Sequence, residues 1–288
     1  MSSVPTLRSY QEKGVAEIRA CFAHGVGRVL YQAPTGSGKT ILFAFIVANA
    51  VARGNRVMIL AHRDEIILQI SEALTVLGVE HVLVTAGYRG EAASVMVASV
   101  ATLVRRLHLL DGIDLIVVDE AHHSVADMWR RILDAAPQAK MLGTTATPLR
   151  ADGRGLVDIF DELVLGPSVA ELIESGYLAR FVAYAPARGP DLRGVRTRAG
   201  DYAVDDLARA MSRGVVIGAA VDEYERRCRG VPAIAFCVDI AHSKLVADRF
   251  RERGWRAAHV DGDTPTDERR ARIAALGAAG STSSPTAA

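Results

Sequence analysis

This sequence contains few cysteines, almost no net charge and no long apolar run, and each shortage excludes a class of protein. Its three cysteines, Cys21, Cys228 and Cys237, are scattered and match no zinc-binding spacing. No apolar run reaches the roughly 18 residues that a membrane span needs, and the N-terminus shows no secretory signal. The formal net charge of +1 provides no global basic field. We therefore expect a cytoplasmic protein with reduced thiols and no membrane partner.

What the sequence does contain is a regular alternation of short apolar runs with segments of helical period. Hydrophobic residues make up 50% of the 288 residues, and the length suggests about two domains at roughly 100–200 residues each. Such alternation predicts an α/β fold with a parallel sheet covered by helices on both faces. The expected strands are 29–31, 57–61, 82–85, 95–98, 115–119 and 141–144, and the expected helices include 41–51, 65–77 and 125–135.

A break near residues 166–167 precedes a second, shorter series of elements. Short helices are expected at 169–174 and 202–211, with a loop rich in Gly, Pro and Arg at 188–200. The low-complexity stretch at the end of the sequence is expected to be disordered. The remaining expectations are strands at 233–238 and 257–260 and helices at 242–253 and 265–276, too few elements for a complete doubly wound sheet.

Residues 33–40 form the motif with the clearest chemistry, Ala-Pro-Thr-Gly-Ser-Gly-Lys-Thr, between an expected strand and an expected helix. Gly36 and Gly38 permit backbone angles that point successive N–H groups at phosphate oxygens, and the helix N-terminus adds a favourable dipole. Lys39 is expected to reach the β- and γ-phosphates, and Thr40 to bind magnesium. The alternative, a chance Gly-Lys-Thr at a glycine-rich turn, fits this context poorly. The predicted ATP contacts are Pro34, Thr35, Gly36, Ser37, Gly38, Lys39 and Thr40.

Two adjacent acids, Asp119 and Glu120, follow the apolar run 115–118. A buried strand delivers such residues to the edge of an open α/β sheet where ligands bind. We expect Asp119 to hold magnesium, and Glu120 to orient and deprotonate the attacking water. The alternative is a strand that runs into an acidic surface turn. The phosphate loop upstream argues against this alternative, because two separate motifs would then both have to be misleading.

Three further residues are weaker candidates for coupling the nucleotide site to the rest of the protein. His122 either links the site to the next strand or is a solvated residue at a helix start. Thr145 and Thr147 follow an apolar run, and their hydroxyls either bond His122 and the carboxylates or belong to a turn before a proline.

In this order and spacing, these motifs resemble the superfamily 2 helicases, over roughly residues 6–276. The resemblance is strongest to bacterial and phage DEAD/DEAH-box proteins related to the type III restriction subunit, with Asp119–His122 as the DEAH box. It implies that Arg8 and Gln11 belong to an adenine-recognition element. It also implies that the nucleic-acid backbone, of DNA or RNA, contacts Arg63, Ser99 and Thr102, without readout of sequence.

The resemblance divides the chain into a RecA-like ATP-binding domain (1–166), connecting helices and a loop (167–230), a partial second RecA-like domain (231–276) and a tail (277–288). Residues 235–237 with His242 and Ser243, and residues 259–262, resemble motifs of the second domain. The family's later motif Gln-x-x-Gly-Arg-x-x-Arg is missing, so the sequence looks truncated before the last two motifs. The arginines at 269, 270 and 272 lie too early to replace it, and a solvated helix face explains them better.

We consider three alternative functions for a chain with these motifs. The first is an ATP-dependent DNA or RNA helicase or translocase, impaired by truncation. The second is a non-enzymatic ATP-binding remnant, or a subunit whose partner supplies the missing arginine. The third, another phosphate-loop enzyme such as a kinase, has no need of Asp-Glu-Ala-His or Thr-Ala-Thr.

Overall fold

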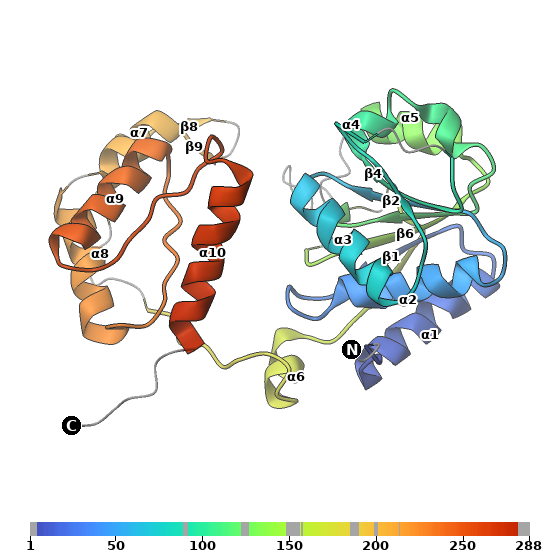
Figure 1. Ribbon diagram of the computed structural model, residues 1–288, viewed down its shortest axis with the longest axis horizontal. Coiled ribbons are helices and arrows are strands. Elements are labelled where there is room, and N and C mark those ends of the chain that lie inside the picture. The colour runs from blue at the N-terminus through green and yellow to red at the C-terminus, as the bar shows by residue number, and fades with distance from the viewer. Residues whose placement is uncertain are drawn as a thin grey trace. The chain divides into compact units, whose positions relative to one another are not determined.

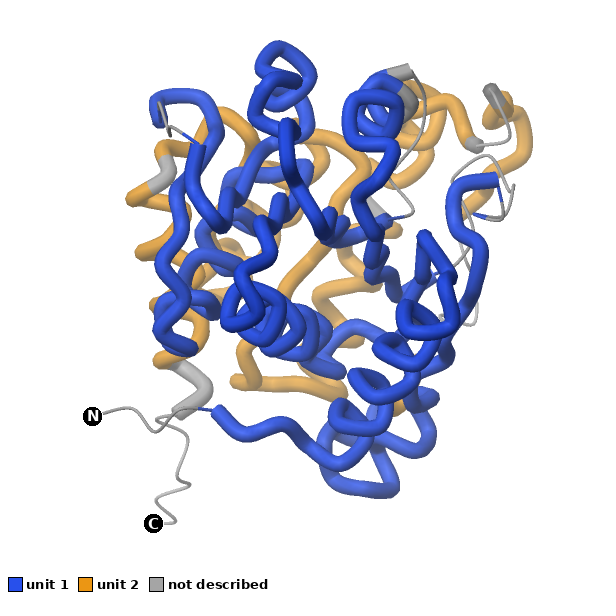
Figure 2. Tube along the Cα trace, turned by 90° about the vertical axis from the view of Figure 1, so that its right-hand side faces the viewer, with its two compact units in different colours: residues 1–181 blue, residues 182–288 orange. Residues whose placement is uncertain are grey.

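The computed structural model describes residues 5–88, 92–121, 127–147, 156, 158–184, 190–198, 201–212 and 214–281. It divides into two compact units, Met1–Phe181 and Val182–Ala288 (Figures 1 and 2). No helix among the described residues is long and apolar enough to cross a membrane.

The first unit contains a sheet of seven strands in the order β3-β4-β2-β5-β6-β1-β7, and every neighbouring pair is parallel. The predicted α/β fold, a RecA-like parallel sheet with helices on both faces, is confirmed. The seventh strand, β7, pairs with β1 and was not predicted. The strands are β1 (Arg28–Gln32), β2 (Val57–Ala61), β3 (Val82–Val84), β4 (Val95–Ser99), β5 (Leu115–Val118), β6 (Lys140–Thr145) and β7 (Glu162–Leu165).

Helices cover both faces of this sheet because side chains alternate along each strand. In β2, Val57 and Ile59 belong to one apolar cluster, whereas Met58 and Leu60 belong to the other. Helices α1 and α2 lie on one side of the sheet, and α4 and α5 lie on the other (Figure 1). The helical elements of this unit are α1 (Ser9–Ala23), α2 (Lys39–Val51), α3 (Asp64–Val76), α4 (Val100–Leu103), the 3-10 helix η1 (Leu107–Leu110), α5 (Asp127–Ala135) and α6 (Val169–Glu174).

Local sequence explains these helices well. In α3, the apolar residues Ile67, Ile70 and Leu74 recur at helical spacing, and all three are buried in the first cluster. Burial of a side chain of this size stabilises the fold by about 1.5–3 kcal/mol. Helix α6 begins with a capping box between Ser168 and Glu171, which satisfies two backbone donors that would otherwise lack partners.

The second unit contains mainly helices and one small antiparallel hairpin. Its core includes Ile217 and Val221 of α8 and Val246 of α9, and the ring of Tyr224 meets Phe250 edge-on at 5.3 Å. The hairpin occupies part of the region expected to be a loop. The elements are β8 (Thr197–Arg198), β9 (Asp201–Tyr202), α7 (Val204–Met211), α8 (Gly214–Arg227), α9 (Ile240–Glu252) and α10 (Thr266–Ser281).

Two expectations for this unit are wrong. Residues 233–238 and 257–260 are not strands, since no ladder pairs either segment within the described part of the chain. A strand needs a neighbour for its backbone groups, and here even the apolar side chain of Phe236 is 96% exposed. The tail expected to be disordered starts at residue 277, but α10 continues to Ser281 through an alanine-rich stretch that favours helix. Residues 282–288 lie outside the described residues.

Candidate functional site

The candidate site lies where three adjacent parallel strands end. The order β5-β6-β1 places the end of β6 between the two segments that carry the predicted chemistry. The register pairs Val118 with Gly143 and Gln32 with Thr145, so Asp119 and the phosphate loop follow at one edge. The N–H of Ala33 donates to the carbonyl oxygen of Thr145 at 3.0 Å. Open α/β sheets bind ligands at this carboxyl edge.

The phosphate loop depends on glycine at two positions. Gly36 has φ +83° and Gly38 has φ +76°, values that side-chain-bearing residues rarely adopt. A Cβ at Gly38 would lie 2.6 Å from Nε2 of Gln11, and one at Gly36 would lie 2.8 Å from Cδ2 of Leu178. The loop therefore needs glycine for its backbone angles and for the close approach of its neighbours.

Lys39 and Ser37 make the loop suitable for a phosphate group. The Nζ of Lys39 is held by the carbonyl oxygens of Ala33 at 3.1 Å and Pro34 at 3.4 Å, and the residue is only 9% exposed. The hydroxyl of Ser37 is buried and has no hydrogen-bond partner among the described residues. Thr40 is half-buried in the first turn of α2. A buried cation, an unused hydroxyl and a helix N-terminus are all suited to an anionic ligand.

The buried carboxylate of Asp119 is held by two donors. Its Oδ1 accepts from the hydroxyl of Thr144 at 2.8 Å and from the N–H of Glu120 at 3.0 Å. Thr144 is fully buried and was not among the predicted site residues. The parallel register was the signal that could have found it, since Gly143 lies opposite the last residue of β5.

Glu120 adopts an unusual backbone conformation. It is the only residue other than glycine with positive φ, +51°, in the described part of the chain, and it is half-buried. The left-handed region costs such a residue about 1–2 kcal/mol. Strain of this kind is typical of functional positions, where the surrounding structure fixes a side chain in a required direction.

The predicted coupling residues are only partly brought together. The Thr145 hydroxyl donates to the carbonyl oxygen of Thr147 at 2.7 Å and accepts from its N–H at 3.1 Å, which closes the turn after β6. The hydroxyl that reaches the carboxylate of Asp119 is that of Thr144 instead. His122 lies outside the described residues.

Gln11 contacts the phosphate loop directly. Its Nε2 donates to the carbonyl oxygens of Ser37 at 3.2 Å and Gly38 at 3.1 Å, while its Oε1 accepts from the N–H of Arg8 at 2.9 Å. The hydroxyl of Tyr10 also donates to the Ser37 carbonyl oxygen, at 2.9 Å. The start of α1 therefore supports the loop, and its contact with adenine remains a prediction.

The residues predicted to contact nucleic acid follow the next two strands of the same edge. The register pairs Ala61 of β2 with Ser99 of β4, and Arg63 is exposed at the start of α3. The hydroxyl of Ser99 donates to Thr102 Oγ1 at 2.8 Å and accepts from the Thr102 N–H at 3.3 Å. Ser99 thus caps α4 as well as lying at the edge.

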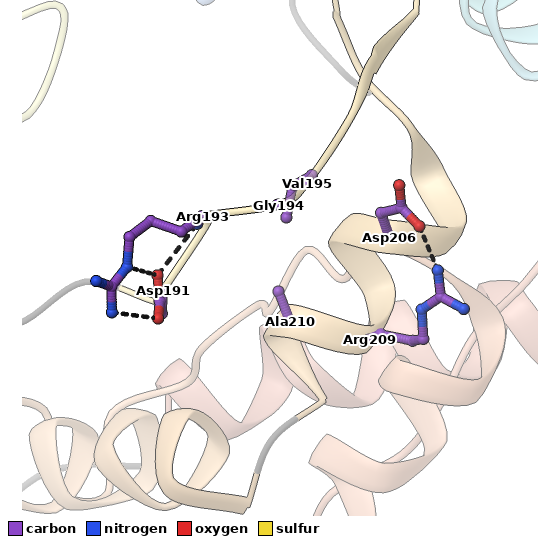
Figure 3. A pocket seen from close by; sticks show the side chains of 7 residues that line it. All are labelled: Asp191, Arg193, Gly194, Val195, Asp206, Arg209 and Ala210. Carbon is purple, nitrogen blue, oxygen red and sulfur yellow. Dashed lines mark hydrogen bonds and ion pairs between the residues drawn. The ribbon is translucent and has the colours of Figure 1, made fainter.

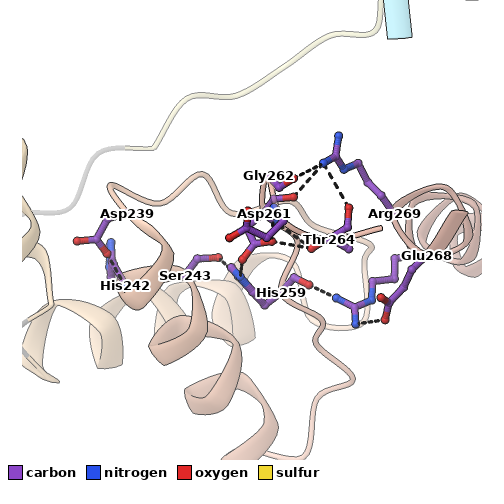
Figure 4. Close-up of polar contacts among 11 residues, drawn as sticks. Asp239, His242, Ser243, His259, Asp261, Gly262, Thr264, Glu268 and Arg269 are labelled. Carbon is purple, nitrogen blue, oxygen red and sulfur yellow. Dashed lines mark hydrogen bonds and ion pairs between the residues drawn. The ribbon is translucent and has the colours of Figure 1, made fainter. Parts of the chain in front are cut away.

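In the second unit, the motif-like residues form a hydrogen-bonded cluster (Figure 4). His259 Nδ1 lies 2.8 Å from Ser243 Oγ, and His259 Nε2 lies 2.9 Å from Asp261 Oδ2. Asp261 also accepts from the Thr264 hydroxyl at 2.8 Å. The hydrogen bond with His259, followed by that from Thr264, lowers the pKa of Asp261 to about 2.

Two arginines of α10, Arg269 and Arg272, form hydrogen bonds with the backbone of this cluster. The expectation that they belong to a solvated helix face is therefore wrong. Arg269 donates to the carbonyl oxygen of Asp261 at 3.0 Å, and Arg272 donates to that of His259. Both side chains therefore attach α10 to the segment that precedes it.

A polar hollow of about 240 Å³ also lies in the second unit (Figure 3). Asp206 is 8% exposed there and is paired with Arg196 and Arg209. The hydrogen bonds from Arg196 lower the pKa of Asp206 well below its usual range. These ion pairs neutralise the buried carboxylate of Asp206 within the second unit itself. Its lining residues are Asp191, Arg193, Gly194, Val195, Asp206, Arg209 and Ala210.

Comparison with known sequences gives a consistent set of relatives. The family model described as type III restriction enzyme, res subunit, matches residues 5–150. A 51.5 kDa protein of Lactococcus phage (isolate 7-9) is 32% identical over 240 residues, which are 83% of this chain and 50% of that protein. The "Putative ATP-dependent helicase IRC3" of Saccharomyces cerevisiae is 30% identical over 291 residues, 93% of this chain and 42% of that protein. The chain thus spans about half the length of these curated relatives.

Comparison with solved structures supports the fold. The crystal structure of the DUF1998 helicase MrfA has a TM-score of 0.55 at 16% identity. The match covers 93% of this chain and 42% of that chain. At this identity, the likeness concerns the fold alone.

Proposed function

We infer the function of this chain from its family: it belongs to the family of the type III restriction enzyme res subunit, and so to the superfamily 2 helicases. We propose that it binds ATP and magnesium at the edge formed by β1, β6 and β5, hydrolyses the ATP, and couples this to movement on a DNA or RNA strand. The single observation that carries the proposal is that Lys39 and Asp119 are both buried at this edge of the sheet. There the N–H of Ala33 donates a hydrogen bond to the carbonyl oxygen of Thr145.

Each residue of the edge has a distinct role in this proposal. Lys39 would leave the carbonyl oxygens of its own loop for phosphate oxygens, which satisfy an ammonium group better because they carry charge. Thr40 and Asp119 would hold magnesium, which supplies positive charge against the phosphates. Glu120 would accept the proton of the attacking water. Arg8 and Gln11 would contact the adenine.

The nucleic acid would lie over the ends of β2 and β4. Arg63 is exposed there and can pair with a phosphate, while Ser99 and Thr102 can bond the sugar-phosphate chain. Such contacts hold the strand without reading its bases. Thr145 and Thr147, with His122, would relay changes at the nucleotide to this half of the edge.

Steady-state ATPase measurements with and without single-stranded DNA test this function. We expect the wild-type chain to hydrolyse ATP faster when the strand is present. Glu120→Gln should bind ATP as the wild type does and lose turnover, because the amide cannot accept the proton. Normal turnover by Glu120→Gln would remove the assigned base.

The alternative function is ATP binding without turnover, or turnover that depends on a partner which supplies an arginine. In this alternative, the arginines of a Gln-x-x-Gly-Arg-x-x-Arg motif would come from another polypeptide. Addition of a polypeptide that bears this motif should then raise turnover. ATP binding with no turnover, with or without DNA and that polypeptide, would identify a binding protein.

A further inference from the structure

Tyr177 lies beside the start of α1, far from it in sequence. The guanidinium carbon of Arg8 lies over its ring, 4.4 Å from the centroid, and the ring of Tyr10 meets it edge-on at 5.3 Å. Two backbone hydrogen bonds fix its position, since Tyr177 and Leu178 both donate to the carbonyl oxygen of Leu172. Leu172 is itself 1% exposed, so the turn that carries Tyr177 is anchored on a buried residue of α6.

This aromatic cluster touches the phosphate loop on two sides. Tyr10 receives a hydrogen bond from Arg8 at 3.0 Å and donates to the carbonyl oxygen of Ser37 at 2.9 Å. The residue after Tyr177, Leu178, packs against Gly36 so closely that a Cβ there would lie 2.8 Å from its side chain. Arg8 and Tyr177 therefore lie next to the loop, connected to it through Tyr10 and Leu178.

The ring of Tyr177 is accessible to a ligand, unlike the buried tyrosine of the same unit. Tyr31 of the same unit is 1% exposed and fills the core beside Gly14 and Gly166, whereas Tyr177 remains 39% exposed. A half-exposed aromatic ring paired with an exposed guanidinium plane is suited to stacking on a nucleobase. Such a surface accepts the flat face of any purine and leaves its edge to hydrogen-bonding groups such as Gln11.

We propose that Tyr177, together with Arg8, stacks on the base of the nucleotide whose phosphates the loop binds. The inference rests on the proposed nucleotide site and adds a base-binding residue to it from beyond α6. Tyr177 would contribute to affinity for the nucleoside part of ATP and contribute nothing to the affinity for the phosphates.

Calorimetric titration with two ligands, ATP and inorganic tripolyphosphate, both with magnesium, tests the proposal. Loss of the ring in Tyr177→Ala should weaken ATP binding roughly 5- to 150-fold, the range for loss of one base–aromatic stack. Tripolyphosphate binding should stay unchanged. Tyr177→Phe should bind both ligands as the wild type does, while Tyr177→Leu, which keeps apolar bulk, should lose ATP affinity as the alanine variant does.

Tyr184→Ala is the matched control, because Tyr184 is also exposed and has the guanidinium of Arg227 3.7 Å from its ring centroid, in the other unit. It should bind both ligands normally. Unchanged ATP affinity in Tyr177→Ala would overturn the proposal, and so would an equal loss of ATP and tripolyphosphate affinity, which would mean that Tyr177 only supports the loop. A wild-type chain that binds neither ligand would instead overturn the nucleotide site itself.

Discussion

The hydroxyl of Thr144 donates a hydrogen bond of 2.8 Å to the carboxylate of Asp119, and both residues are buried at the ends of adjacent strands. This contact orients the predicted magnesium ligand, and it comes from a residue that precedes the predicted coupling threonines. A carboxylate with one oxygen engaged in this way keeps its other oxygen for a metal ion.

Replacement of Thr144 by Val should therefore weaken the response to magnesium. The change keeps the shape of the side chain and removes the hydroxyl, which leaves a buried carboxylate without one donor, at a cost of about 1–3 kcal/mol in the free energy of unfolding. A magnesium titration of nucleotide binding measures the effect on the site. Thr144→Ser should recover most of the response to magnesium, because it keeps a hydroxyl at this position. Equal magnesium dependence in the wild type and in Thr144→Val would contradict the orienting role.

Gly38→Ala should damage the phosphate loop in two ways that can be separated. The positive φ costs alanine about 1–2 kcal/mol, and its Cβ would also clash with Nε2 of Gln11. Gly54 is the matched control, because its φ is +84° but nothing lies within 4 Å of a Cβ there. Chemical denaturation should show that Gly38→Ala loses more stability than Gly54→Ala. The double variant Gly38→Ala with Gln11→Ala should recover part of the difference.

Arg63→Ala should weaken binding to single-stranded DNA by the same factor for all sequences. If the guanidinium neutralises one phosphate, the slope of log K against log salt concentration should fall by about 0.7. Arg63→Lys should retain the slope because it retains the charge. Binding measured at several salt concentrations decides the matter. An unchanged slope in the alanine variant would mean that the DNA strand does not contact Arg63.

The pair His259–Asp261 should make the second unit sensitive to acid. The pKa of Asp261 is lowered to about 2 from its ordinary value of 3.8, so the folded state favours the ionised form. The resulting stability is fully present above pH 4 and is lost as the pH falls toward 2. Asp261→Asn should be less stable than the wild type at neutral pH. The difference in free energy of unfolding should shrink over this interval, and a constant difference would count against the pair.

Much of the first unit could be predicted because its signals are local. The apolar runs of β1 to β6 and the phosphate-loop motif needed no knowledge of distant neighbours. β7 gave no such signal, since it is a short edge strand in which Leu163 and Leu165 are largely exposed. Its pairing with β1 depends on contacts between distant parts of the chain.

The expectations that failed depend on contacts between distant residues. The apolar run at 233–238 has the composition of a strand, but composition does not supply a partner, and Phe236 is left exposed. Thr144 was missed because motif spacing favoured the threonines after it, whereas the choice between neighbours depends on register. The positions of Gln11 and Tyr177 beside the loop depend on how α1 and the turn after α6 pack, which no local pattern encodes.

The most direct test of the account is the equilibrium affinity for ATP with magnesium, compared between the wild type and Lys39→Ala. Lys13→Ala is the control, because the Lys13 side chain is 78% exposed in α1. We predict that the wild type and Lys13→Ala bind ATP equally and that Lys39→Ala does not bind it measurably. Equal affinity in all three proteins would contradict the nucleotide site on which the proposed function rests.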